Sequence, residues 1–127
     1  MPFRPLRIAI LAGALAAASA AQAHPRLVAA APAANSVVDG RNEIRLTFSE
    51  ALVAPFSGMS IMMTDMPGMK MTTPMSVGAI TSSVAADGKT LVGRTKAPLQ
   101  PGTYALGWHA VTADTHRVEG SYSFTVK

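Results

Sequence analysis

Methionine is concentrated in one short segment, between residues 59 and 75. Seven of the protein's eight methionines fall there. Pro67-Gly68 and Pro74 argue against a helix through the second half of the segment, so its large apolar side chains would lie exposed in a loop. Thioether sulfur is a soft ligand that selects Cu(I). The candidate Cu(I) ligands, three or four of which would bind at once, are Met63, Met66, Met69, Met71 and Met75.

Other interpretations of these methionines stay open. One or two methionines are ordinary gap-fillers of a hydrophobic core. Met59, Met62, Met63 and Met66 have a spacing that a helical apolar stripe would also give. Met62 alternates with Met63, and it is expected to face the core while Met63 faces outward.

Asp114 and His116 form a second group with ligand chemistry. Alternate residues of an extended chain share a face, so the two side chains can point at one ion. The carboxylate could bind the ion directly or instead orient an imidazole from outside the coordination shell. The alternative is a polar loop whose aspartate and histidine are merely solvated.

The first 23 residues predict a secretory signal peptide. Two arginines precede a short apolar run that ends at Ala20, and Ala21-Gln22-Ala23 is an Ala-x-Ala cleavage signature. A retained membrane anchor is the alternative, although the run is too short to span a bilayer comfortably. Cleavage after Ala23 divides the chain into a signal at 1–23 and one domain at 24–127.

Cleavage there would make His24 the first residue of the mature protein. Its free α-amine and its imidazole could then chelate one metal ion, because an α-amine has a pKa near 8 and gives up its proton readily to a metal. Pro25 has no amide hydrogen, so the metal must take its further ligands from elsewhere in the fold. With His116 and Asp114 the donor set is three nitrogens and one oxygen, which favours Cu(II). The alternative is that His24 merely follows the cut.

His109 is less easily placed. It directly follows Trp108, a predicted core residue, and should therefore lie on the opposite face of its strand. It is a further candidate ligand, or a group that supports one.

The elements that must position these residues are short strands. Apolar and polar residues alternate in several segments that are separated by turn signals such as Asp87-Gly88 and Pro101-Gly102. No segment has a sustained helical period. These features predict an all-β antiparallel sandwich or small barrel of about seven strands, with no substantial helix. The expected strands lie at 27–30, 44–48, 60–63, 77–84, 90–94, 103–111 and 121–126.

Composition narrows the function classes. The chain has no cysteine, so it can build neither a disulfide nor a thiolate metal site. Removal of the signal would leave nine basic and seven acidic residues, a net charge of +2. The basic residues are scattered rather than clustered, which argues against a nucleic-acid partner.

The sequence closely resembles the CopC family of periplasmic copper-resistance proteins over essentially the whole mature chain. The matching stretches include His24-Pro-Arg-Leu-Val28, Leu46-Thr-Phe-Ser-Glu50, Met63-Thr-Asp-Met-Pro-Gly-Met69, Pro74-Met75 and the run from Trp108 to His116. The resemblance implies an Ig-like Greek-key β-barrel in the periplasm, with Cu(II) and Cu(I) sites at opposite ends. His24, Asp114 and His116 would hold Cu(II), and Met63, Met66, Met69 and Met75 would hold Cu(I).

Three positions differ from the pattern or extend it. Glu50 falls on an acidic position near the Cu(II) end and would act from outside the coordination shell, or simply be a solvated strand end. Met71 stands where members that bind Cu(I) often carry histidine. His109 stands where a different polar residue is common, so it could add a ligand.

The expected function is a copper carrier or buffer for resistance and homeostasis, mostly monomeric. It would hand ions to an inner-membrane copper transporter or another periplasmic copper protein. One alternative is a copper oxygenase-like enzyme built on an amino-terminal histidine, which would need an open coordination position. The other is a metal-free Ig-like interaction module, which would leave the methionine segment unexplained.

Overall fold

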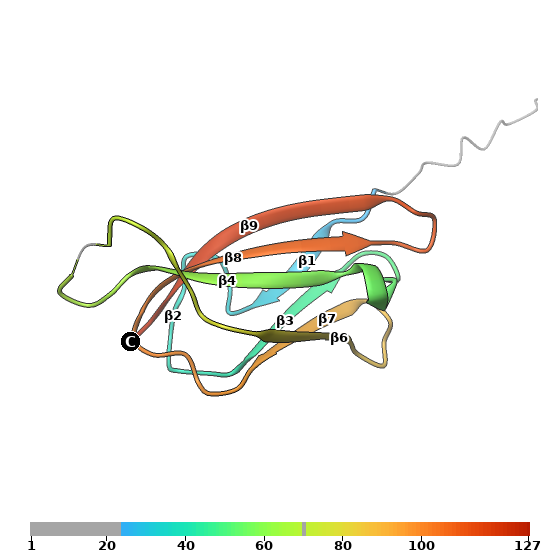
Figure 1. The fold of residues 1–127 in the computed structure, drawn as a ribbon. Helices are drawn as coiled ribbons and strands as arrows, with labels where there is room; N and C mark the ends of the chain where they lie inside the picture. The colour runs from blue at the N-terminus through green and yellow to red at the C-terminus, as the bar shows by residue number, and fades with distance from the viewer. Residues whose placement is uncertain (1–23, 70) are drawn as a thin grey trace, which may run out of the picture.

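The computed structural model describes residues 24–69 and 71–127, and the predicted signal peptide lies outside the described residues. Within these described residues, nine strands form two sheets, joined by connections that pass between them (Figure 1). Seven of the strands have five or more residues, as the sequence predicts. One sheet has the order β1-β3-β7-β6 and the other the order β2-β9-β8-β4-β5. The strands are β1 Leu27–Ala31, β2 Val37–Val38, β3 Glu43–Phe48, β4 Gly58–Asp65, β5 Met75–Ser76, β6 Ile80–Val84, β7 Thr90–Thr95, β8 Gly102–Val111 and β9 Arg117–Val126.

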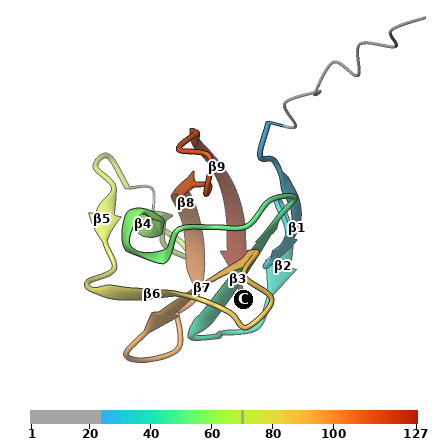
Figure 2. The same ribbon diagram turned by 90° about the vertical axis from the view of Figure 1, so that its right-hand side faces the viewer.

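The pairing confirms the predicted β-sandwich. All neighbouring strands run antiparallel except β2 and β9, which pair in parallel. The described residues contain one short helical turn, the 3₁₀ segment Ala54–Phe56. The end-on view shows the two sheets facing each other, with β1 on the side of β9 and β6 on the side of β5 (Figure 2).

The core fills the space between the sheets. Alternation along β8 sends Tyr104, Leu106 and Ala110 inward, where each is almost fully buried. Phe124 stacks against Tyr104 with ring centroids 5.6 Å apart. Trp108, which the sequence predicts in the core, and Tyr122 are half-buried and pack against the edge of the core.

The orientation of Met62 is a correction. Along β4, Met59, Ile61 and Met63 face inward, whereas the side chain of Met62 is 40% exposed on the outer face of the sheet. Met62 pairs with Ser76 and Ala105 on that face. The prediction that Met62 faces the core was wrong, because the inward positions at 59 and 61 fix the phase of the strand and place residue 63 inside.

The candidate residues lie at the two ends of the sandwich. The β8–β9 connection and the beginning of β1 are at one end, and the β4–β5 hairpin with its methionines is at the other (Figure 1). We call these the histidine end and the methionine end.

Candidate metal centres

The structure brings His24 and His116 together at the histidine end. Their ring centroids are 5.9 Å apart and the rings are tilted by 44°. The segment before β1 is anchored by two hydrogen bonds between Arg26 and Ser49, one from the Arg26 amide to Oγ at 3.1 Å and one from the Ser49 amide to the Arg26 carbonyl at 2.9 Å. Pro25 is buried. These contacts hold the residue after the predicted cleavage point beside a loop that lies 92 positions further along the sequence.

The loop that carries Asp114 and His116 is tightly turned. The Thr112 amide donates to the His116 carbonyl at 3.0 Å, and the Thr115 amide donates to the Thr112 carbonyl at 2.8 Å. Thr115 has a positive φ of 70°. The turn directs the Asp114 carboxylate back toward His116, where Oδ2 lies 2.9 Å from Nδ1. That contact is within ion-pair distance although it lacks hydrogen-bond geometry, and the Nδ1 atom is shielded from solvent.

The carboxylate of Asp114 is held in its charged form. The Thr112 hydroxyl donates a hydrogen bond to it, and this bond is the main reason that the pKa of Asp114 lies below its ordinary value. The His116 amide and imidazole add smaller effects in the same direction. A histidine whose Nδ1 faces a carboxylate presents Nε2 to a metal, an arrangement common around protein metal sites. The sequence analysis did not identify Thr112. The feature that could have identified it is a threonine two residues before an aspartate in a turn.

The three predicted Cu(II) residues do not all converge on one point. Among residues 24–69 and 71–127, no three His, Asp or Glu side chains form a group that could hold a metal ion. His116 contacts His24 on one side and Asp114 on the other. His116 therefore lies between the other two predicted Cu(II) ligands.

Glu50 and His109 stand apart from this pair. Glu50 is half-buried just after β3, and no described residue hydrogen-bonds or ion-pairs with its carboxylate. His109 lies on the outer face of β8, as predicted, opposite Glu119 and Gly58. Its ring covers Gly58, where an added Cβ would lie 3.1 Å from Cε1. His109 thus leans toward β4, away from β9, the strand that begins just after His116.

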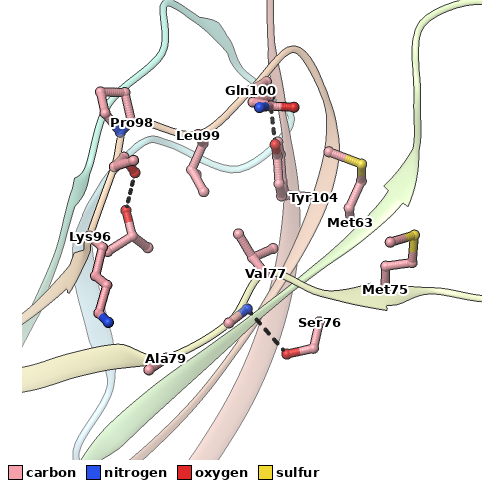
Figure 3. A pocket seen from close by; sticks show the side chains of 13 residues that line it. Met63, Met75, Ser76, Val77, Ala79, Lys96, Pro98, Leu99, Gln100 and Tyr104 are labelled. Carbon is pink, nitrogen blue, oxygen red and sulfur yellow. Dashed lines mark hydrogen bonds between the residues drawn. The ribbon is translucent and has the colours of Figure 1, made fainter.

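At the methionine end, backbone pairing places four methionines opposite one another in two pairs. Met63 and Met75 are direct cross-strand partners in β4 and β5, and both line a cavity of about 490 Å³ (Figure 3). Met66 and Met69 face each other across a tight turn that Gly68 closes with a φ of 72°. Met69 is 63% exposed and Met66 is 41% exposed. Met71 follows the turn and is half-buried.

Replacing Thr112 with valine is expected to raise the pKa of Asp114 toward its ordinary value. The isosteric change removes the hydroxyl donor but keeps the backbone hydrogen bond between Thr112 and His116. A carboxylate whose folded-state pKa is depressed contributes stability above its unfolded pKa and loses it as the pH falls through the folded pKa. The pH titration of the Asp114 carboxyl resonance in the metal-free protein measures this directly. An unchanged titration curve would show that Thr112 does not set the charge of Asp114.

The described part of the chain contains no helix that is both long and apolar enough to cross a membrane.

Comparisons with known proteins agree with this architecture. A CopC domain model matches residues 27–127. The chain is 46% identical over 120 residues to copper resistance protein C of Xanthomonas campestris pv. juglandis, covering 94% of this chain and 92% of the relative. It is 44% identical over 124 residues to copper resistance protein C of Escherichia coli, covering 96% and 98%.

Solved structures give the same result. The crystal structure of selenomethionine PcoC, a copper resistance protein from Escherichia coli, superposes with a TM-score of 0.75 at 43% identity, covering 80% of this chain and 99% of that one. The crystal structure of CopC from Methylosinus trichosporium OB3b gives a TM-score of 0.63 at 28% identity, covering 82% and 94%. With a matching family model, full-length relatives and a shared two-sheet sandwich, the chain belongs to the CopC family.

Proposed function

We propose that this protein is a periplasmic copper carrier or buffer that serves copper resistance and homeostasis. A signal peptide at 1–23 is removed, and the domain at 24–127 binds copper in two oxidation states. Cu(II) is held by the amine and imidazole of His24 with His116 and Asp114. Cu(I) is held by three or four thioethers, drawn from Met63, Met66, Met69, Met71 and Met75.

The approach of His24 to His116 is the observation that carries the proposal. Two imidazoles 5.9 Å apart lie in a protein that has only three histidines. Cleavage after Ala23 would add a third nitrogen at the same place, and Asp114 supplies an oxygen beside His116. Three nitrogens and one oxygen suit the tetragonal preference of Cu(II). The charged carboxylate of Asp114 also offsets part of the ion's charge.

Support for the Cu(I) site comes from exposure and chemistry together. Met66, Met69 and Met75 are large apolar side chains that are 41%, 63% and 58% exposed at one end of the molecule. Exposing them has a hydrophobic cost that a purely structural role would not justify. Thioethers bind Cu(I), and they cannot be lost to disulfide formation in an oxidising compartment.

A carrier fits the family better than an enzyme does. The CopC relatives are copper-resistance proteins rather than enzymes. A coordination shell filled by protein ligands suits storage and transfer, whereas catalysis needs an open position. The receiving partner would be an inner-membrane copper transporter or another periplasmic copper protein.

Mass spectrometry of the processed protein followed by copper titration tests the proposal. We expect an amino terminus at His24, one tightly bound Cu(II) in air, and one Cu(I) under reducing conditions. A mature chain that begins at another residue would remove the amine from the Cu(II) site. Failure to retain copper after dialysis would contradict the carrier function itself.

A further inference from the structure

Exposed sulfur atoms are gathered at the methionine end of the sandwich. The chain has no cysteine, so thioethers are the only sulfur groups that an oxidant can reach. Four methionines with exposed side chains lie on β4, on β5 or on the connection between them (Figure 1): Met62, Met66, Met69 and Met75. An oxidant must touch a sulfur atom to oxidise it, so these four thioethers should react first.

Met59 provides the contrast within the same segment. Its side chain is buried on the inner face of β4. Its sulfur fills the space over Gly93 of the opposite sheet, where an added Cβ would overlap the sulfur atom. A peroxide molecule reaches this sulfur only when the two sheets separate. The fold therefore divides the methionines of this segment into protected and accessible ones.

The turn between β4 and β5 should keep its shape when its methionines gain oxygen. The Met69 amide donates to the Met66 carbonyl at 3.1 Å, and Gly68 closes the turn with a φ of 72°. The backbone therefore holds this turn, and both methionine side chains are exposed. A sulfoxide is polar and would disrupt a core, but an exposed sulfoxide is hydrated by the surrounding water.

We propose that Met66, Met69 and Met75 are sites of reversible oxidation by peroxide, and that their sulfoxides close the Cu(I) site. This inference rests on the proposed function, because it assigns a regulation to the thioethers of the same site. The sulfur attacks one oxygen of the peroxide, so that the O–O bond breaks and an S=O bond forms. Sulfur gives up two electrons, and the proton of the transferred oxygen passes to the leaving hydroxide, which departs as water.

The product is a poor ligand for Cu(I). A sulfoxide presents a hard oxygen where the thioether presented soft sulfur, and Cu(I) prefers the soft donor. Methionine sulfoxide reductases reverse the oxidation, and the exposed turn leaves these side chains open to such enzymes. Peroxide would thus release Cu(I) from the methionine end, and repair would restore binding.

Oxidation and metal binding compete for the same sulfur atoms. A bound soft ion should therefore shield the ligating thioethers from peroxide. Met62 is an internal control, because its side chain is 40% exposed, against 41% for Met66. It pairs with Ser76 on the outer face of β4 and is not a candidate ligand. If exposure alone mattered, a bound ion would affect Met62 and Met66 equally.

Peptide mapping of the processed protein after treatment with hydrogen peroxide tests the inference. Silver(I) replaces Cu(I) in this step, because it is a soft monocation that does not cycle between oxidation states with peroxide. Without metal we expect similar oxidation of Met62 and Met66, and none of Met59 while the near-ultraviolet circular dichroism is unchanged. Silver should protect Met66, Met69 and Met75 but not Met62.

Cu(I) affinity is then measured by competition with a coloured chelator. The oxidised protein should bind Cu(I) at least about tenfold more weakly than the untreated protein, because loss of even a supporting group costs that much. Treatment with methionine sulfoxide reductases should restore the affinity, which separates sulfoxide formation from unfolding. Peroxide should weaken Cu(I) binding equally in Met62→Leu, because a sulfoxide at this position plays no part.

The outcomes separate this inference from the proposed function. Equal protection of Met62 and Met66 by silver would overturn the inference, as would an unchanged Cu(I) affinity after all three proposed sites are oxidised. In both cases the untreated protein would still bind Cu(I), so the carrier proposal stands. Oxidation of Met59 as fast as Met69 in the folded protein would show that the fold does not select the sites. If the untreated protein binds no Cu(I), the proposed Cu(I) site fails and the inference fails with it.

Discussion

One glycine added before His24 is expected to abolish tight Cu(II) binding and to leave Cu(I) binding unchanged. The addition converts the α-amine into an amide, which removes one of three nitrogen donors and breaks the chelate ring on the same residue. Loss of a group that merely supports a ligand costs about 10–100-fold in metal affinity, so loss of a ligand should cost at least that much. Electron paramagnetic resonance of the Cu(II)-loaded protein reads the donor set directly, and a competing chelator gives the affinity.

Two companion variants make the result specific. His24→Ala keeps a free amine but removes the imidazole that lies 5.9 Å from His116, so it should also lose the site. His109→Ala leaves the His24–His116 pair intact, because its ring lies over Gly58. An extended protein with an unchanged Cu(II) spectrum would show that the amine is not a ligand. Loss of the signal in His109→Ala would place His109 in the coordination shell.

Much of the fold could be predicted because alternation is a local signal. β3, β7 and β8 were expected within one residue of their bounds, since clear turn signals flank them and β3 and much of β8 alternate inward and outward residues. β2 and β5 were not predicted, because a strand of only two residues is too short to show an alternating pattern. They owe their existence to pairing with β9 and β4, which is a property of the tertiary structure.

The error at Met62 has a different origin. Met59, Ile61 and Met63 can form one apolar face of a strand. The sequence fits this arrangement as well as it fits the predicted one, in which Met62 faces inward. The outward position was given to Met63 because it was expected to bind metal. Met63 instead faces inward and lines the cavity. A methionine can therefore face inward and still be a candidate ligand.

The histidine site depends on contacts that no local pattern contains. His24 and His116 are 92 positions apart, and they meet because Ser49 anchors the segment before β1. Sequence spacing indicated only that Asp114 and His116 share a face. Their grouping with His24 rested on donor chemistry, and the family resemblance implied the same set. The support that Thr112 gives to Asp114 became visible only in the folded loop.

Replacing both Met66 and Met69 with leucine is expected to weaken Cu(I) binding at least about tenfold and to spare Cu(II). The two residues are partners in a β-bridge across an exposed turn, so the double change removes both sulfurs of that turn. Leucine keeps the volume and apolar character of methionine, and such exchanges usually cost less than about 1.5 kcal/mol even in a core. Competition with a coloured Cu(I) chelator under reducing conditions measures the change.

Met62→Leu is the matched control for this pair. Met62 belongs to the same segment and is 40% exposed, similar to Met66, but it lies on the outer face of β4 beside Ser76. If thioethers act as ligands rather than as general apolar surface, Met62→Leu should keep the parent Cu(I) affinity while the double variant loses it. If the parent, Met62→Leu and the double variant have equal Cu(I) affinities, Met66 and Met69 are not Cu(I) ligands. Only Met63, Met71 and Met75 then remain as candidates. A loss in Met62→Leu as large as in the double variant would mean that copper is held on the outer face of the sheet, contrary to the inward pairing of Met63 and Met75.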